Sequence, residues 1–375
     1  MMHIGLNAHL LSPRAGYRAA GIHGYMFNTL VRLPAAAPAD WRFTVMVGAS
    51  NPLELPPMQV RRAGMNTESP LRRVIWEQMI QPFVVRDFDL LHALAFVAPV
   101  LPVPPYVVTI YDLSFIHYPS VLSASRRAYL RAFTAHTCRH ATRVIAISQS
   151  TARDVIATFD IDPARVDVAP GGTDFSVFRP LPAEQVSAFR LAQGLPDVFW
   201  LFIGTLEPRK NLPTLLRAYA TLPPTERPPL VIGGGKGWDY AEIFQTVAAY
   251  NLTNDVRFVG FIPTEDLALW YNSASTFVYP SVYEGFGLPV LEAMACGTPV
   301  IAADTSSLPE VVGGSVGMLV APHDVEAWAA ALIRARDDAA WRQQARNSGL
   351  IAAQRYTWEN TAQQTVNSYK NSQLQ

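Results

Sequence analysis

The stretch YPSVYEGFGLPVLEAMACGTP, residues 279–299, decides the fold. It predicts the end of a strand, a loop containing Gly285 and Gly287, and a short helix. Pro289 would open that helix and Gly297 would close it, because these residue types are favoured at those two ends. In an α/β sheet the loop that leaves the carboxyl end of a strand is where ligands bind. The start of the helix offers free N–H groups and a partial positive charge, which suits a diphosphate.

Two carboxylates flank this loop. Glu284 precedes it and Glu292 follows it, so both are placed to accept hydrogen bonds from sugar hydroxyls. The alternative is that the glycines are ordinary turn residues and that the glutamates fall eight apart by chance. The complete string of loop, helix start, carboxylate and glycine stop favours a ligand site.

Short apolar runs alternate with amphipathic segments of helix length on both sides of this stretch, which is typical of βαβ units with a parallel sheet. The first half of the chain predicts strands at 3–8, 43–47, 90–93, 107–110, 144–147 and 166–169. The second half predicts strands at 200–203, 230–233, 256–259, 276–279, 299–302 and 317–320. Gly and Pro gather in residues 170–182, so we expect an N-terminal domain at 1–180 and a C-terminal domain at 181–354. A final helix, within 355–375, should pack back on the first domain.

Composition supports two compact domains. Of the 375 residues, 50% are hydrophobic and 16% are charged, which excludes long disordered stretches. Residues 1–180 carry 17 Arg and no Lys against 12 acidic residues, and residues 181–375 carry the opposite excess. This balance argues against a nucleic-acid-binding protein. The basic half suits an anionic partner such as a phospholipid surface or a lipid diphosphate, or it is simply a solvated face.

Two cysteines are too few for a disulfide framework, and no signal-peptide pattern opens the sequence. Prolines interrupt the most apolar window, residues 90–110, so we predict no membrane-spanning helix. We therefore expect a cytoplasmic protein. The arginine-rich segment 125–143 predicts an amphipathic helix, whose default role is solvation and whose alternative is peripheral contact with the inner face of the membrane.

The stretch 279–299 closely resembles the donor-binding motif of GT-B glycosyltransferases of family four, in which two glutamates are separated by seven residues. The resemblance extends over nearly the whole chain. It implies two facing Rossmann-like domains with parallel sheets and a cleft between them. It also implies a retaining mechanism that uses no metal and no cofactor, the nucleotide sugar being a substrate. By resemblance Glu284 contacts the donor sugar and Glu292 the ribose, and the remaining donor contacts in this stretch are Gly285, Phe286, Gly287 and Leu288.

A second element, FIGTLEPRKN at 202–211, predicts a strand that runs into a glycine turn and two adjacent cations. Arg209 and Lys210 could neutralise a departing diphosphate, or they could be solvated loop residues. In the family this position resembles a Gly-Arg-Leu turn followed by a lysine. Lys210 matches that lysine and Gly204 the glycine, whereas Thr205 replaces the arginine, whose charge Arg209 could supply.

Other positions match more loosely. Ile262 resembles the residue whose backbone reads the nucleobase, and it is otherwise apolar packing. Gly21 resembles the glycine-rich loop that begins the first helix, and it is otherwise a plain turn. His92 ends a predicted strand, where it either faces a ligand or is a hydrogen-bonded structural group. The family usually has a histidine where this chain has Tyr111, so Asp112 becomes the more plausible polar group there, unless it caps the following turn.

These observations predict a hexosyltransferase that uses a nucleotide-diphosphate sugar and a glycan or lipid-linked acceptor. The arginine–lysine turn resembles that of the family's mannosyltransferases, which makes GDP-mannose the first expectation and a UDP-sugar the second. One alternative is a sugar phosphorylase or epimerase of the same fold. Another is a non-catalytic nucleotide-sugar-binding subunit, in which Tyr111 and Thr205 would mark loss of activity.

Overall fold

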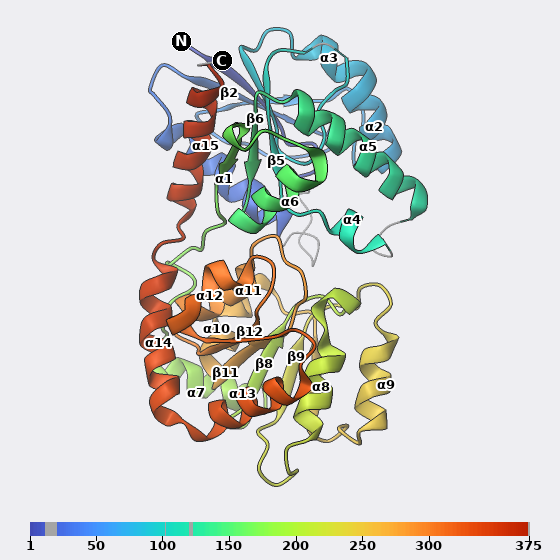
Figure 1. Ribbon diagram of the computed structural model, residues 1–375. Coiled ribbons are helices and arrows are strands. Elements are labelled where there is room, and N and C mark those ends of the chain that lie inside the picture. Colours follow the sequence, from blue (N-terminus) through green and yellow to red (C-terminus); the bar gives the residue numbers. More distant parts are fainter. Residues whose placement is uncertain (12–20, 102, 120–122, 374–375) are drawn as a thin grey trace. The chain divides into compact units, whose positions relative to one another are not determined.

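The computed structural model describes residues 1–11, 21–101, 103–119 and 123–373. It divides into two compact units, which Figure 1 shows coloured along the chain. Unit 1 comprises Met1–Gly172 and Trp358–Gln375, and unit 2 comprises Thr173–Thr357.

Unit 1 is built on a seven-stranded sheet in which every pairing is parallel. The order is β3-β2-β1-β4-β5-β6-β7. The strands are β1 (His3–Asn7), β2 (Arg42–Val47), β3 (Gln59–Arg62), β4 (Leu90–Ala93), β5 (Tyr106–Ile110), β6 (Arg143–Ala146) and β7 (Val166–Val168). The helices are α1 (Ile22–Ala36), α2 (Pro70–Ile75), α3 (Gln81–Val84), α4 (Ser114–His117), α5 (Ala124–His140), α6 (Gln149–Phe159) and α15 (Trp358–Ser372). A π-helical turn, Trp76–Ile80, joins α2 to α3.

Unit 2 repeats the same design with six parallel strands in the order β10-β9-β8-β11-β12-β13. The strands are β8 (Trp200–Ile203), β9 (Leu230–Gly233), β10 (Val256–Gly260), β11 (Thr276–Tyr279), β12 (Val300–Ala303) and β13 (Met318–Val320). The helices are α7 (Ala183–Ala192), α8 (Leu212–Ala220), α9 (Ala241–Ala249), α10 (Leu267–Ser273), α11 (Leu288–Ala295), α12 (Leu308–Val316), α13 (Val325–Asp337) and α14 (Ala339–Ala353).

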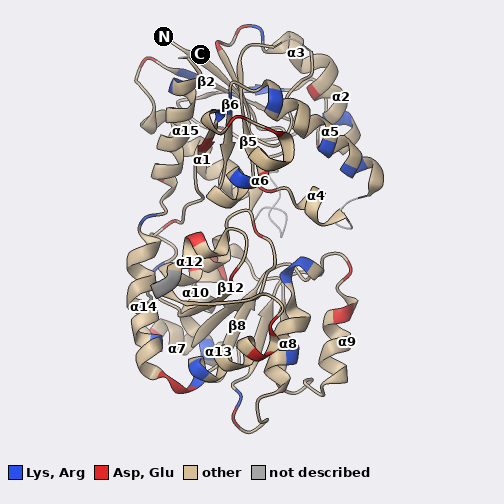
Figure 2. Cartoon of the chain, viewed as in Figure 1, with Lys and Arg blue, Asp and Glu red and all other residues tan. Residues whose placement is uncertain are grey.

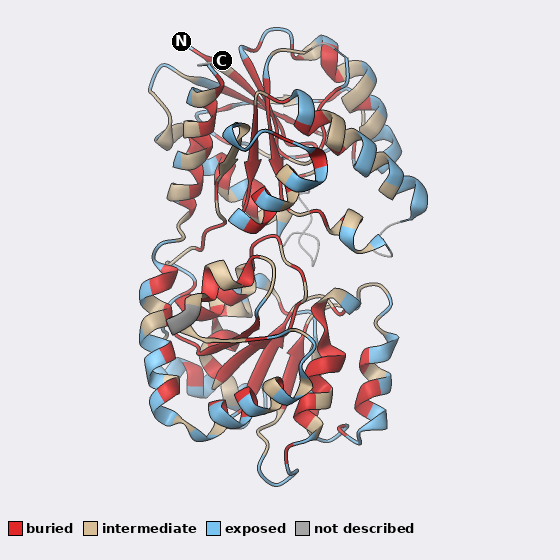
Figure 3. Cartoon of the chain, viewed as in Figure 1, coloured by how far each residue is buried: buried red, intermediate tan, exposed pale blue. Residues whose placement is uncertain are grey.

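The inner strands of both sheets are buried on both faces, as Figure 3 shows in red. Sheets covered by helices on two sides need continuous apolar strands, and this is why the expected strands were recognisable from runs such as VVTI and WLFI. The sequence missed β3, whose residues Gln-Val-Arg-Arg lie at the edge of the sheet and are partly exposed. An edge strand with polar side chains carries no such apolar signal.

The boundary between the units falls after Gly172, ahead of the expected residue 180. The segment that follows belongs to unit 2 because its backbone is bonded there. Thr173 N–H donates to the Tyr356 carbonyl at 3.0 Å, and Leu181 N–H donates to Asn272 Oδ1 at 2.9 Å. The expected final helix is α15, which begins at Trp358.

Helix α15 packs in unit 1 against α1 and against the strands β5, β6 and β7. The Trp358 ring meets the Tyr25 ring edge-on, and Arg32 Nε lies 2.6 Å from Glu359 Oε1. Deeper in unit 1, the Tyr369 hydroxyl lies 2.6 Å from His92 Nδ1, and His92 Nε2 lies 2.8 Å from Thr109 Oγ1. The last helix of the chain therefore completes the core of the first unit. Within the described residues, no helix combines the length and apolar character needed to cross a bilayer.

The hydrogen bond between the Tyr369 hydroxyl and His92 Nδ1 leads to a testable prediction about the stability of unit 1. Replacing Tyr369 by Phe leaves the fully buried His92 Nδ1 without its partner, so the free energy of unfolding of unit 1 should fall by about 1–3 kcal/mol. Calorimetric thermal unfolding measures the effect. Tyr250→Phe is the control, since Tyr250 is 47% exposed. Equal stability of the two variants would contradict a structural role for the Tyr369–His92 pair.

Candidate functional site

The site residues of unit 2 gather at one edge of its sheet. Because all strands are parallel, the loops that leave their carboxyl ends meet at the same edge. Gly204 and Thr205 follow β8, Gly233–Gly235 follow β9, and Ile262 follows β10. The strand order reverses between β8 and β11, and their two loops carry Arg209, Lys210 and residues 284–288. Such a reversal is the position at which doubly wound sheets bind ligands.

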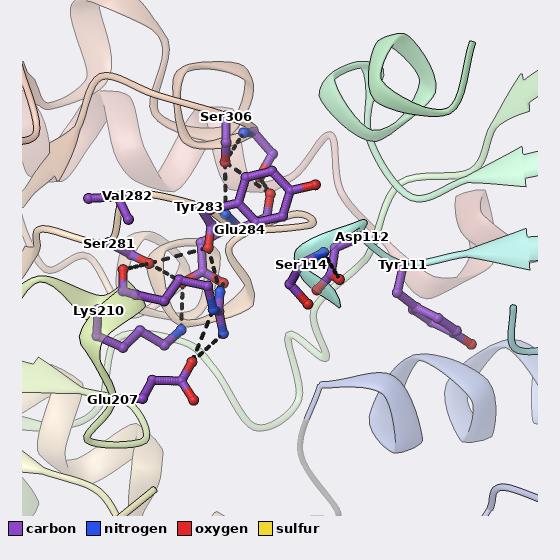
Figure 4. A network of polar contacts seen from close by, with 12 residues as sticks. Tyr111, Asp112, Ser114, Glu207, Lys210, Ser281, Val282, Tyr283, Glu284 and Ser306 are labelled. Carbon is purple, nitrogen blue, oxygen red and sulfur yellow. Dashed lines mark hydrogen bonds and ion pairs between the residues drawn. The ribbon is translucent and has the colours of Figure 1, made fainter. Parts of the chain in front are cut away.

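Glu284 is the centre of a dense polar network (Figure 4). Its Oε1 accepts hydrogen bonds from Lys210 Nζ at 2.5 Å, Ser281 Oγ at 2.6 Å and the Tyr279 hydroxyl at 3.0 Å. Its Oε2 lies 3.1 Å from Arg209 Nη1. Burial alone would raise the pKa of this carboxyl, but the adjacent Lys210 and Arg209 charges outweigh it and lower the pKa to about 2. Glu284 is therefore a permanent anion that fixes two cations in place.

The two cations differ in their surroundings. Lys210 is buried, and its Nζ also donates to the Tyr279 hydroxyl at 2.8 Å. Burial, reinforced by Arg209, lowers the pKa of Lys210, and Glu284 opposes that shift. The Arg209 guanidinium bridges Glu207 and Glu284 and also donates to the Tyr283 carbonyl. An Arg–Lys pair with this geometry can stabilise negative charge that develops on a neighbouring phosphate.

The backbone of Glu284 is fixed as firmly as its side chain. The Glu284 N–H donates to Ser306 Oγ at 2.8 Å, and its carbonyl accepts from the Ser306 and Ser307 hydroxyls at 3.0 and 2.9 Å. These serines follow β12, and the sequence analysis did not identify them. Their position just after an apolar strand of the same sheet was the available signal.

The loop after Glu284 leads into α11 through Gly287, whose φ of +105° lies in the region that favours glycine. A Cβ there would lie 2.8 Å from Leu308, so a side chain would be both strained and crowded. Gly285 is buried, and the Phe286 side chain is buried against the Tyr356 ring, at 5.3 Å between centroids. Leu288, partly exposed, begins the helix. The predicted donor contacts at Gly285, Phe286 and Gly287 would therefore have to come from the backbone, whereas Leu288 also has a partly exposed side chain.

Glu292 occupies a contrasting environment. In place of a cation it has the Tyr271 hydroxyl, which donates to its Oε2 at 2.9 Å. Burial raises the pKa of Glu292 to about 7, and this hydrogen bond only partly opposes the shift. One of the two predicted carboxylates is therefore always charged, whereas the other changes its protonation near neutrality.

The remaining donor-side positions are ordered in the same loops. Gly204 packs beside Lys210, since a Cβ on Gly204 would lie 3.7 Å from Lys210 Cε. Thr205 is partly exposed and follows in the same turn. Ile262 is 7% exposed, and its side chain packs over Gly233. The Ile262 side chain thus has the apolar packing role that the sequence analysis left open as the alternative. The proposed nucleobase contact would then have to come from the backbone of Ile262.

Most of the predicted site residues in unit 1 have structural roles in the fold. His92 is 1% exposed, with both ring nitrogens bonded, which favours the structural interpretation over ligand contact. Asp112 Oδ1 accepts from the Ser114 N–H at 2.8 Å, so it caps the following turn. Tyr111 is buried and donates to the Leu94 carbonyl at 2.8 Å. Gly21 is exposed with a φ of +66° and begins α1, whereas Ala20, the residue before it, lies outside the described residues.

Unit 1 instead has a polar cluster that the sequence analysis missed. Asn7 ends β1 beside the point where the strand order reverses between β1 and β4, and His9 follows two residues later. Asn7 Nδ2 donates to Gln81 Oε1 at 3.3 Å, and His9 Nδ1 lies 3.2 Å from Thr67 Oγ1. All four of these side chains are buried. The sequence signal was a pair of polar residues directly after an apolar strand.

The π-helical turn Trp76–Ile80 supplies the rest of this cluster. Burial raises the pKa of Glu77 to about 7, although Arg73 and Asn7 oppose the shift. In the part of the chain that the structure describes, His9 Nε2, Trp76 Nε1 and Gln81 Nε2 are buried without a hydrogen-bond partner. Such atoms are uncommon in proteins, and they mark a place where water or a ligand hydroxyl would complete the bonding.

Comparison with known proteins identifies the family. Residues 187–350 match the family of group 1 glycosyl transferases, and residues 33–177 match Glycosyltransferase Family 4. The O-antigen chain mannosyltransferase B of Escherichia coli is 36% identical over 266 residues, which span 70% of each chain. The chain belongs to the GT-B glycosyltransferases of family four and resembles their mannosyltransferases.

Solved structures agree with this fold. The sucrose-phosphate synthase of Thermosynechococcus elongatus superposes with a TM-score of 0.78 at 26% identity, over 100% of this chain and 99% of its own. Anabaena HepE in complex with UDP-glucose superposes with a TM-score of 0.76 at 21% identity, over 99% of this chain and 100% of its own. The resemblance inferred from residues 279–299 is confirmed for fold and family.

The raised pKa of Glu292 predicts a pH dependence of stability. Below about pH 4.5 this carboxyl is protonated in the folded and the unfolded state, so the shifted pKa does not change the stability. As the pH rises from the usual pKa of 4.5 to the folded-state pKa near 7, the unfolded state loses the proton first and the folded state becomes less stable. Glu292→Gln keeps an acceptor for Tyr271 and removes the charge. The melting temperature of this variant minus that of the wild type should therefore grow from pH 5 to pH 8. A difference that stays constant over this range would contradict the shifted pKa.

Proposed function

We propose that this chain transfers mannose from GDP-mannose to a hydroxyl of a glycan or lipid-linked acceptor, with retention of anomeric configuration and without a metal ion or cofactor. The observation that carries the proposal is the Arg209–Lys210 pair, held by Glu284 where the strand order of the unit 2 sheet reverses. The nearby start of α11 after Gly287 adds the partial positive charge of a helix N-terminus for the same diphosphate.

The reaction begins with the donor diphosphate against these groups. The bond between the anomeric carbon and the diphosphate breaks, and its electron pair passes to the phosphate oxygen, where Arg209 and Lys210 stabilise the growing charge. The acceptor oxygen then bonds to the anomeric carbon on the same face and releases its proton to the departing phosphate. Glu284 acts by fixing the cations and by presenting its remaining Oε2 lone pair to a sugar hydroxyl.

The contacts of the Glu284 carboxylate support a substitution in which the acceptor enters on the same face of the sugar as the leaving diphosphate. A double displacement would need a carboxylate with a free oxygen as the nucleophile. Glu284 Oε1 already accepts three hydrogen bonds, Oε2 is paired with Arg209, and the two cations lower the pKa of the group to about 2. Such a carboxylate is a weak nucleophile, so we favour direct attack by the acceptor hydroxyl over a covalent intermediate on Glu284. The departing phosphate then takes the proton of that hydroxyl.

The choice of mannose rests on the relative of known activity, whose name describes mannosyl transfer onto O-antigen chains. A UDP-sugar is the second candidate, because HepE was solved with UDP-glucose. We infer that unit 1 binds the acceptor, and the cluster of Asn7, His9, Trp76 and Gln81 supports this, because within the described residues it contains buried polar atoms without a hydrogen-bond partner. We expect this activity in the cytoplasm, with the arginine-rich α5 as a contact to anionic lipid.

The deciding experiment incubates the purified chain with GDP-mannose or UDP-glucose and with glycan or polyprenyl-linked acceptors, and it follows both products. Release of nucleoside diphosphate together with a mannosylated acceptor supports the proposal. Donor binding without turnover on any acceptor would favour a non-catalytic binding subunit. Sugar phosphate, or an epimerised nucleotide sugar, would favour the phosphorylase or epimerase alternative.

Lys210 provides a matched test of the chemistry. Lys210→Met should lower kcat by about 100-fold or more, because a buried charge facing the leaving group is lost. Lys370→Met is the control, since Lys370 is an exposed lysine of α15. Steady-state kinetics with saturating donor measure the effect. An unchanged kcat in Lys210→Met would remove this residue from the mechanism.

Glu292 provides a test of nucleotide binding. Glu292→Ala should weaken the binding of nucleoside diphosphate by about tenfold, because the ribose hydroxyls lose a charged acceptor. Isothermal titration calorimetry measures the dissociation constant, with Glu326→Ala as the exposed control on α13. An equal constant in wild type and Glu292→Ala would exclude the ribose role.

A further inference from the structure

Four large apolar side chains lie exposed along one segment of unit 1. Leu71, Ile75, Met79 and Phe83 follow each other at intervals of four residues from α2 through the π-helical turn into α3. They are 71%, 41%, 64% and 59% exposed. Single exposed apolar residues are ordinary, but a regular row of four is not. This row is referred to below as the apolar stripe.

The segment that carries the stripe also has buried residues, which attach it to unit 1. Elsewhere in the segment, the side chains of Trp76, Gln81, Pro82 and the following Val85 are buried in unit 1. The stripe is therefore not needed to anchor the segment, since the opposite face already does so. Exposed apolar area of this size costs free energy in water unless something covers it.

The apolar surface extends beyond the segment. Gln78 in the π-helical turn accepts from the Val100 N–H at 3.0 Å and donates to the Ala98 carbonyl at 3.3 Å. These bonds hold the adjoining loop beside the stripe. Val100 and Leu101 in that loop are 48% and 44% exposed, so they add to the same apolar surface.

Positive charge borders the stripe. Arg72 and Arg86 on the same segment are exposed, and the Arg86 guanidinium lies 4.8 Å from the centre of the Phe83 ring. The neighbouring carboxylate of Asp87 is paired with Arg61 at 2.8 Å rather than with Arg86. Arginines next to exposed apolar side chains are the combination that binds the interface of an anionic bilayer.

Helix α5 adds a second row of arginines. It adjoins the loop that Gln78 holds, because the Ala98 N–H donates to Thr137 Oγ1 of α5 at 3.0 Å. Figure 2 shows α2 and α5 with Lys and Arg in blue, and Figure 3 shows exposed residues along both. Arg126 and Arg131 are exposed, and residues 124–140 contain no Asp or Glu.

We propose that the apolar stripe, with Arg72 of α2, Arg86 just after α3 and the arginines of α5 around it, docks unit 1 on an anionic phospholipid bilayer. The stripe would lie in the boundary between head groups and acyl chains, and the arginines would contact the lipid phosphates. A protein partner or a second copy of this chain would need carboxylates placed opposite the arginine border, whereas the phosphates of an anionic bilayer supply negative charge over the whole surface. This inference does not depend on the sugar donor, and it extends the contact expected of α5 to a surface on α2 and α3.

The test is co-sedimentation of the full chain with vesicles of phosphatidylglycerol and phosphatidylcholine. The wild type should bind these vesicles, bind pure phosphatidylcholine more weakly, and lose affinity at high salt. The double variant Met79→Ser, Phe83→Ser should lose about tenfold or more of its affinity, because two apolar side chains no longer enter the bilayer. Arg126→Gln, Arg131→Gln should lose most of the preference for anionic lipid.

The control is Leu191→Ser, Ile351→Ser, which removes from unit 2 two apolar side chains that are more exposed than Met79 and Phe83, and it should bind as the wild type does. Thermal unfolding and nucleotide binding of every variant verify that the fold is intact. The proposal is overturned if the wild type stays in solution with anionic vesicles, or if the stripe variant binds as tightly as the control. It is also overturned if light scattering finds a dimer of the wild type that the stripe variant abolishes.

Discussion

The structure of unit 2 depends on one ionic cluster, in which the Glu284 carboxylate is paired with the side chains of Lys210 and Arg209. Burying a charge is costly unless it is paired and hydrogen bonded, and here every charge of the group has a partner. The loops that leave β8 and β11 are thereby joined where the strand order of the sheet reverses. Removing any one member would leave an uncompensated charge in the interior.

The second glutamate shows how the same residue type acquires a different property. Glu284 and Glu292 are eight residues apart, yet one faces two cations and the other a tyrosine hydroxyl. A pair of titratable groups with pKa values driven apart is typical of sites that carry chemistry. The fold achieves this separation because the loop ends at Gly287 and places Glu292 on a helix turned towards α10.

Much of the fold and of the site around Glu284 could be predicted from the sequence, and the reasons are physical. Buried parallel strands need continuous apolar residues, so runs such as VVTI revealed the inner strands, whereas the polar edge strand β3 was missed. The motif around Glu284 was recognisable because glycine, proline and carboxylate positions are local constraints. The serines that fix Glu284, and the cluster of His9, Trp76 and Gln81, come from segments distant in sequence, and no local pattern predicts which of them meet. His92 was ambiguous for the same reason, because its partners Tyr369 and Thr109 are brought to it by tertiary packing, whereas Asp112 caps the local turn through Ser114.

The return of α15 to unit 1 has a consequence for the order of folding during synthesis. Unit 2 is continuous in sequence, so it can complete its core as soon as Thr357 has left the ribosome. Unit 1 is translated first, but the ring of Tyr369 that covers His92 is translated only near the end of the chain. The half of the protein that is made first is therefore the last to be finished, and until then the α1 face that α15 will cover stays open to water and to chaperones.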